Sequence, residues 1–345
     1  MEIQYAELMK KASGSMNSRI SKGVLDYLSE VEEYNSPFEI INLILKNDFR
    51  HIFSIKQVAI DCSTAILLLI LINIFKDAFR KVRIYETVNF VFTVFLFSPI
   101  IVTLYSMLNT AVLYIKDIST FIGVISPTVG ILAASGGNLS YAKIHGVFFS
   151  LLLGASQILL NSTIPMVISV FFVLAIVDSF TGTGKLMHFS QLLKNAFFGI
   201  FAIATALFFI IVNTYGETAK ISDTASSKAL RLLIGNAIPI IGGTISDSLK
   251  VLGGSIATVK NRIGIGGVVF ILTIYLPVLV LLWISGMLLN LVAFLCDYFS
   301  IWELKRLVLH MKYMLDFTLA GLSSIVVASL INISTFISTF PVVMI

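Results

Sequence analysis

Charged residues are scarce in this 345-residue chain, and their scarcity decides its broad class. Only 12% of the residues are Asp, Glu, Lys or Arg, about half the share that is usual in soluble domains, whereas 57% are hydrophobic. A soluble fold of this size would need more polar surface. The apolar residues form long runs, and a helix that crosses a bilayer needs about 20 of them. The composition therefore predicts an all-α, polytopic transmembrane helical bundle.

Residues that carry catalysis or bind metal ions are also few. The two cysteines lie in apolar stretches and cannot build a disulfide framework. The Gly-rich segment 181–186 has Leu186 where a phosphate-binding loop needs Ser or Thr. Four histidines are scattered without ligand spacing, at positions His51, His145, His188 and His310. We therefore expect no enzyme activity, no cofactor, no metal site and no nucleic-acid partner.

The charges that are present divide the chain into two regions. Residues 1–54 contain six Lys or Arg and eight Asp or Glu, whereas residues 55–345 confine most charges to short clusters between apolar runs. Pro37 follows Asn-Ser and predicts a break between two helices, at 2–33 and 38–54. We expect a small water-exposed helical region followed by a multi-pass membrane domain.

The first apolar run, Ile55–Phe75, is followed by the densest basic cluster of the chain, at residues 76–83. Because positive clusters remain in the cytoplasm, the run is expected to cross from outside to inside, which leaves residues 1–54 outside. Moving so many charges across a membrane ordinarily requires a signal peptide. We expect a precursor with such a signal ahead of this sequence.

Alternation from that point predicts about eight to ten apolar segments in total. It places 13 Lys or Arg inside and four outside, in the sense of the positive-inside rule. Two uncharged stretches, 144–177 and 263–296, are predicted to be helical hairpins that turn at Pro165 and Pro277. The other expected segments are Val88–Ile115, Ile118–Ala134, Ala196–Val212, Leu232–Ile245 and Leu315–Phe340.

Two similar Pro/Gly motifs indicate an internal duplication, with repeats at about 88–195 and 196–312. From Pro127 to Pro165 is 38 residues, and from Pro239 to Pro277 is also 38. In the predicted topology the repeats are parallel. The candidate helix-break or pathway residues are Pro127, Gly130, Gly136, Gly137, Pro165, Pro239, Gly242, Gly243, Asp247 and Pro277.

Proline and paired glycines break helices and leave backbone groups unpaired. In a bilayer this is tolerated only where the broken segment is buried in protein or lines a polar cavity, so two such segments indicate a pathway or binding site near the midplane. Spanning and re-entrant segments both remain open. The other interpretation is that the glycines only allow close helix packing.

The second motif also carries a family resemblance. The runs NAIPIIGGTISDS (236–248), VLGGS (251–255) and VKNRIG (259–264) resemble the stage III sporulation protein AE family, as does LAASGG (132–137). The resemblance covers about residues 55–340. Family precursors carry a signal peptide, in agreement with the expected orientation.

The resemblance implies a permease-like subunit of the channel between mother cell and forespore. It implies partners among the other SpoIIIA operon proteins, including a cytoplasmic ATPase and ring-forming subunits, and SpoIIQ of the forespore. It also implies a location in the mother-cell membrane around the forespore (the outer forespore membrane). A homo-oligomer is left open.

Two other functions remain open: a structural membrane platform for ring and ATPase subunits, and an independent secondary transporter of small molecules. A driven transporter normally needs a central charge, which the sequence hardly offers. The basic stretches 185–195 and 303–312 are candidate docking surfaces for the ATPase or interfacial helices in contact with anionic membrane lipid.

Overall fold

The structure is a computed structural model. It describes residues 138–181, 184–237 and 242–339, together with scattered helical positions between 60 and 134. Helices make up nearly all of these residues. The description leaves out the side chains of residues 226–266. Residues 1–54 lie outside it, so the predicted helices and orientation of that region stay predictions.

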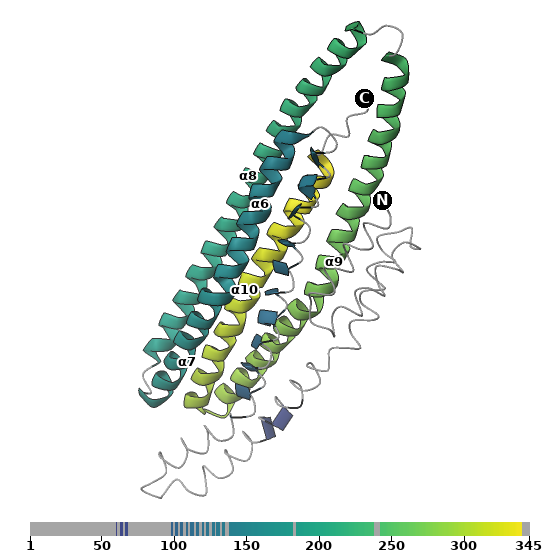
Figure 1. Cartoon of the computed structure of the whole chain (residues 1–345). Coiled ribbons are helices and arrows are strands. Elements are labelled where there is room, and N and C mark those ends of the chain that lie inside the picture. Colours follow the sequence, from purple (N-terminus) through teal and green to yellow (C-terminus); the bar gives the residue numbers. More distant parts are fainter. Residues whose placement is uncertain are drawn as a thin grey trace, which may run out of the picture.

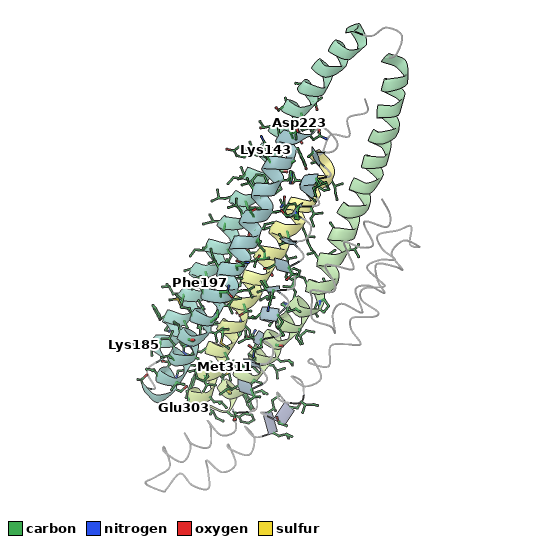
Figure 2. The ribbon with its side chains drawn as sticks, in the orientation of Figure 1. Lys143, Lys185, Phe197, Asp223, Glu303 and Met311 are labelled. Atoms are coloured by element: carbon green, nitrogen blue, oxygen red, sulfur yellow. The ribbon has the colours of Figure 1, made fainter. Side chains whose placement is uncertain are left out.

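Long helices run side by side through the part of the chain that the structure describes (Figure 1). The α7–α8 and α9–α10 connections lie at one end, which we call the Lys185 end, and Figure 2 shows Lys185 and Glu303 there. Lys143 and Asp223 lie toward the opposite end, which we call the Asp223 end. The elements are α6 Leu139–Ile158, η1 Leu159–Thr163, α7 Ile164–Thr181, α8 Lys185–Ala237, α9 Gly242–Tyr298 and α10 Trp302–Thr339.

The chain continues in one direction through Pro165, where the sequence predicts a hairpin. A π-helical turn, η1, joins α6 to α7, and Thr163 Oγ1 bonds to the carbonyl of Ile158, five residues earlier, at 3.4 Å. Proline has no N–H for an α-helical bond, and a π turn is a common way for a helix to continue past such a defect. The predicted hairpin within 144–177 is therefore wrong.

The second predicted hairpin is wrong as well. Pro277 lies inside α9, a single helix of 57 residues. The expected segment Leu232–Ile245 is not an independent span either, because 232–237 belong to α8 and 242–245 to α9. Figure 1 shows that α8 and α9 both extend past α6 at the Asp223 end.

These corrections change the expected topology. A hairpin at Pro165 would put Lys143 and Lys185 on the same side of the membrane, but the two residues lie at opposite ends of the bundle (Figure 2). The continuous segment Leu139–Ser179 has 41 residues and is therefore about 62 Å long, twice the thickness of the hydrocarbon core. The predicted distribution of 13 and four basic residues depended on the hairpins and does not hold.

The all-α membrane class is confirmed. Within the described residues, four helices are long and apolar enough to cross a bilayer: Leu139–Ser179, Lys185–Ala225, Tyr275–Tyr298 and Trp302–Ile337. The internal duplication and the two-domain division stay predictions.

Helix α10 occupies the centre of the bundle. It packs against α6, α7, α8 and α9, and Phe317 and Leu322 on it have no exposed surface. Of the residues in the most apolar stretch of each helix, 56% are buried in α10 but only 6% in α8. Helix α8 is thus a peripheral helix whose large apolar side chains face outward.

Candidate functional site

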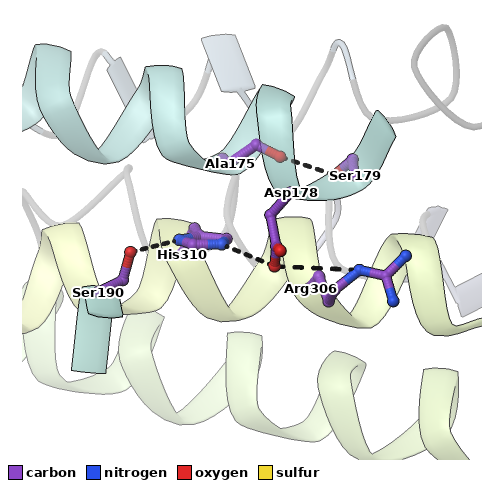
Figure 3. A network of polar contacts seen from close by, with 6 residues as sticks. All are labelled: Ala175, Asp178, Ser179, Ser190, Arg306 and His310. Atoms are coloured by element: carbon purple, nitrogen blue, oxygen red, sulfur yellow. Dashed lines mark hydrogen bonds and ion pairs between the residues drawn. The ribbon is translucent and has the colours of Figure 1, made fainter. Parts of the chain in front are cut away.

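Three helices meet at a buried polar cluster near the Lys185 end (Figure 3). Asp178 comes from the end of α7, Ser190 from the second turn of α8, and His310 from α10. Nδ1 of His310 lies 2.8 Å from Oγ of Ser190, and Nε2 of His310 lies 3.3 Å from Oδ2 of Asp178. All three residues have a relative exposure of 0%, so the imidazole bridges two helices in the protein interior.

With an ionised carboxylate and a neutral imidazole, the three groups have one consistent set of bond directions. An ionised Asp178 can only accept, so Nε2–H of His310 donates to the carboxylate. A neutral imidazole then has Nδ1 as its acceptor, and the Ser190 hydroxyl donates to it. Nε of Arg306, one helical turn before His310 on α10, lies 4.0 Å from Asp178 Oδ2 and supplies the balancing charge.

Ser, His and Asp are also the members of a hydrolase triad, but this cluster lacks the required access. A nucleophile must be reached by its substrate, and Ser190 has no exposed surface. The arrangement instead provides polar bonds between helices in an apolar environment, where such bonds hold helices in one register. We interpret the cluster as a structural contact that holds α7 and α8 against α10.

A second buried cluster lies at the Asp223 end. The carboxylate of Asp223 on α8 accepts from the backbone N–H of Ser140 at 3.2 Å and of Tyr141 at 2.9 Å. These are among the first N–H groups of α6, which have no partner within their own helix. Because a helix N-terminus also carries partial positive charge, a carboxylate is well suited to this position.

The same cluster attaches α6 to α10. The hydroxyl of Tyr141 donates to the carbonyl of Thr335 at 3.2 Å, and Nδ1 of His145 lies 3.1 Å from Oδ1 of Asn332. The rings of Tyr141 and His145 are 4.1 Å apart between centroids. Asn332 and His145 are fully buried. If either residue were replaced by alanine, the other would lose a hydrogen bond that water cannot replace.

From one cluster to the other, polar pairs join α8 to α10 at several depths. Thr205 and Ser324 lie 2.6 Å apart, and Thr335 Oγ1 lies 3.5 Å from Asn213 Oδ1. Together with Ser190 and His310, these pairs have sequence separations of 119 to 122. A nearly constant separation means that α8 and α10 run parallel without slipping. We call this series of pairs the α8–α10 ladder.

The residues predicted from the Pro/Gly motifs do not gather at these clusters. Pro127 and Gly130 line an open groove of about 580 Å³ against α6, beside Lys143 and Gly146. Gly242 and Gly243 are the first residues of α9, which begins at the Asp223 end (Figure 1), and the backbone of Asp247 follows in the same helix. Pro165 follows η1, and Pro277 is inside α9. Gly136, Gly137 and Pro239 lie outside the described residues.

The close-packing interpretation of the glycines can be checked at several positions. A Cβ on Gly130 or Gly146 would meet no atom within 4 Å, so neither glycine is required for packing in the described structure. Gly321 of α10 differs, because a Cβ there would lie 3.2 Å from Cδ2 of Leu159 in the π turn. Close helix packing through glycine thus occurs at Gly321 of α10 and not at Gly130, the one predicted glycine whose surroundings the structure describes.

Sequence reasoning missed the buried clusters. Asp178 and His310 are 132 residues apart, and neither lies in a recognisable motif. A signal was nevertheless present, because Arg306 and His310 are spaced i, i+4 and therefore share one helix face near the start of an apolar span. An acidic residue at the end of another span is the natural partner for such a face.

Long apolar helices joined by buried polar pairs define a polytopic α-helical membrane protein. The family model of stage III sporulation protein AE matches residues 20–339, and the chain belongs to that family. A curated relative, stage III sporulation protein AE of Bacillus subtilis (strain 168), is 20% identical over 271 residues, which are 78% of this chain and 67% of the relative. No solved structure matches.

Proposed function

We propose that this chain is the permease-like membrane subunit of the channel that connects mother cell and forespore during sporulation. In this role it forms or anchors a transmembrane conduit in the mother-cell membrane around the forespore. Membership of a sporulation family and four helices able to span a membrane support the proposal. Its proposed partners are the SpoIIIA-type ATPase and ring-forming subunits and SpoIIQ of the forespore.

The position of α10 carries the proposal that the conduit forms between subunits. Phe317, Thr318 and Leu322 of α10 are fully buried at the centre of the described bundle, so side chains fill its axis. Helix α8, in contrast, exposes most of its apolar span. A chain with a packed axis and an open flank provides one wall of an assembly, made with further copies of itself or with its partners.

A structural platform is the second proposal, and the Lys185 end favours it. The basic stretches 185–195 and 303–312 were separate in the sequence, but the structure places the starts of α8 and α10 at the same end of the bundle. Lys305 there is held by Asp297 at 2.9 Å. The exposed Lys185 also lies at this end (Figure 2), and positive charge there suits the docking of a cytoplasmic ATPase.

An independent secondary transporter receives less support. No charged residue lies between Lys194 and Glu217 on α8 or after Asp316 on α10. The buried acids Asp178 and Asp223 belong to the two end clusters, each with polar partners. We propose that the chain works without cofactor or metal and is not an enzyme.

Replacing Gly242 and Gly243 by Leu separates the conduit from the platform. The conduit predicts that spore formation fails in the native host while the variant still co-purifies with the ATPase and ring subunits. The platform predicts that co-purification itself is lost. Gly199→Leu is the matched control, because a Cβ at Gly199 meets no atom within 4 Å, and it should leave both readouts unchanged.

Reconstitution separates the conduit from the transporter. The purified chain alone in liposomes is expected to pass no small polar dye, whereas liposomes that also contain the ring subunits and ATPase are expected to pass it. Substrate uptake by the purified chain alone, driven by an ion gradient, would contradict the proposal and support the transporter.

A further inference from the structure

Two lysines and one carboxylate meet between α8 and α10 at the edge of the apolar region. Nζ of Lys312 lies 3.1 Å from Oδ2 of Asp316, and Nζ of Lys194 lies 3.6 Å from the same oxygen. The side chains of both lysines are 18% exposed, and that of Asp316 is 19% exposed. The three groups thus form a half-buried ionic cluster with a small opening to the outside.

The cluster has one positive charge in excess. Two ammonium groups share a single carboxylate, and among the described residues no other acid lies within ion-pair distance of either lysine. Aromatic rings also lie near both ammonium groups. Lys194 Nζ lies 5.0 Å from the ring centroid of Tyr313 and 6.0 Å from that of Phe198, and Lys312 Nζ lies 5.9 Å from Tyr313. Such contacts orient a cation without neutralising it.

The position of the cluster along α8 and α10 indicates its depth in the bilayer. Helix α8 has no charged residue between Lys194 and Glu217, and α10 has none after Asp316. The uncharged part of α8 has 22 residues and spans about 33 Å, close to the thickness of a hydrocarbon core. The cluster therefore lies at the level where the phosphates of a bilayer leaflet lie.

We propose that Lys194 and Lys312 bind the phosphate of an anionic phospholipid of the phosphatidylglycerol or cardiolipin class. Basic pockets between transmembrane helices are suited to such headgroups. Phe198, one turn further along α8, is 41% exposed and offers an apolar surface to an acyl chain. The bound lipid neutralises the excess charge and joins α8 to α10 beside the Ser190–His310 bond. This proposal is independent of the proposed conduit.

Lipid binding to the purified full-length chain in mild detergent tests the proposal. Phosphatidylglycerol and cardiolipin, read out by native mass spectrometry and thermal unfolding, are expected to bind and stabilise the chain. Phosphatidylcholine and inorganic phosphate at the same concentration are expected to have no effect. Equal stabilisation by inorganic phosphate would show an anion site that is not specific for lipid, and would overturn the proposal.

Substitutions test the named residues in opposite directions. Lys194→Gln and Lys312→Gln each leave one Lys–Asp316 pair intact, so both variants should fold, and each is expected to weaken phosphatidylglycerol binding about fivefold. Asp316→Asn removes the competing carboxylate and is expected to strengthen binding. Lys185→Gln, an exposed lysine at the same end, should bind like the unmodified chain. Unchanged binding in the Lys194→Gln/Lys312→Gln double variant would contradict the proposal.

Discussion

Nε2 of His310 lies 3.3 Å from Oδ2 of Asp178, and this contact joins α10 to α7 across 132 residues of sequence. Removal of the imidazole by His310→Ala leaves the buried Asp178 with Arg306 at 4.0 Å as its remaining charged neighbour. We expect a loss of about 3 kcal/mol in the free energy of unfolding, because an unpaired buried charge is costly. The difference in the free energy of unfolding between the variant and the unmodified chain can be measured in mixed detergent micelles.

Two further variants serve as controls for this contact. Asp178→Asn keeps an oxygen that accepts from His310 but removes the carboxylate charge that faces the buried Arg306, so it should also destabilise the chain. His188→Ala, at an exposed position near the same end, should change stability by less than about 0.5 kcal/mol. Equal losses for His310→Ala and His188→Ala would refute the role of the cluster.

The carboxylate of Asp223 is expected to hold the first turn of α6. Asp223→Ala removes the acceptor for the N–H groups of Ser140 and Tyr141, and loss of a cap of this type costs about 1–2 kcal/mol. Hydrogen exchange should therefore accelerate at these two amides. The exposed Glu217→Gln on the same helix should leave their exchange rates unchanged, and equal acceleration by both variants would contradict the capping role.

Gly321 and Gly199 form a matched pair for testing the packing of α10. Gly321→Leu places side-chain atoms against Leu159 and Phe201, where even a Cβ would be 3.2 Å and 3.5 Å from them. Overpacking of this kind costs about 1–3 kcal/mol, whereas Gly199→Leu has open space and should cost little. Thermal unfolding of the two variants in detergent measures the difference, and its absence would argue against the α10–η1 contact.

The register of the α8–α10 ladder can be tested by cross-linking. In a chain with Cys62 and Cys296 replaced by Ala, Thr205→Cys with Ser324→Cys should form a disulfide on oxidation, because the two hydroxyl oxygens are 2.6 Å apart. Ala204→Cys with Ser324→Cys should not, since Ala204 is exposed on another face of α8. The shift in mobility on a non-reducing gel reports the bond. Equal cross-linking of both pairs would show that α8 is not held in this register.

Composition was sufficient to predict the helical membrane class, because few charges and long apolar runs leave no other way to satisfy the backbone. The prediction failed where local chemistry competed with helix continuity. Asn161-Ser162-Thr163 before Pro165 is suitable for a turn, but the same residues form a π turn that keeps the helix intact. A sequence pattern does not distinguish a hairpin turn from a π turn, since both accommodate the missing N–H of the proline.

The candidate sites show the same limit. The contacts of Asp178, His310 and Asp223 arise only when helices far apart in sequence pack together, and no local pattern contains them. The Pro/Gly motifs, in contrast, are visible in the sequence, but the structure places Gly242 at the start of α9 and Pro127 at a groove against α6. Their proposed role in a conduit depends on the assembly rather than on the fold of one chain.

The topology of the bundle depends most directly on α6, η1 and α7 forming one membrane-crossing segment, because this segment separates Lys143 from Lys185 (Figure 2). Single cysteines at Lys143 and Lys185, in the chain without native cysteines, can be labelled with a membrane-impermeant maleimide from either side of the membrane. The continuous segment predicts that the two positions react from opposite sides. Labelling of both from the same side would restore the hairpin at Pro165 and contradict the account.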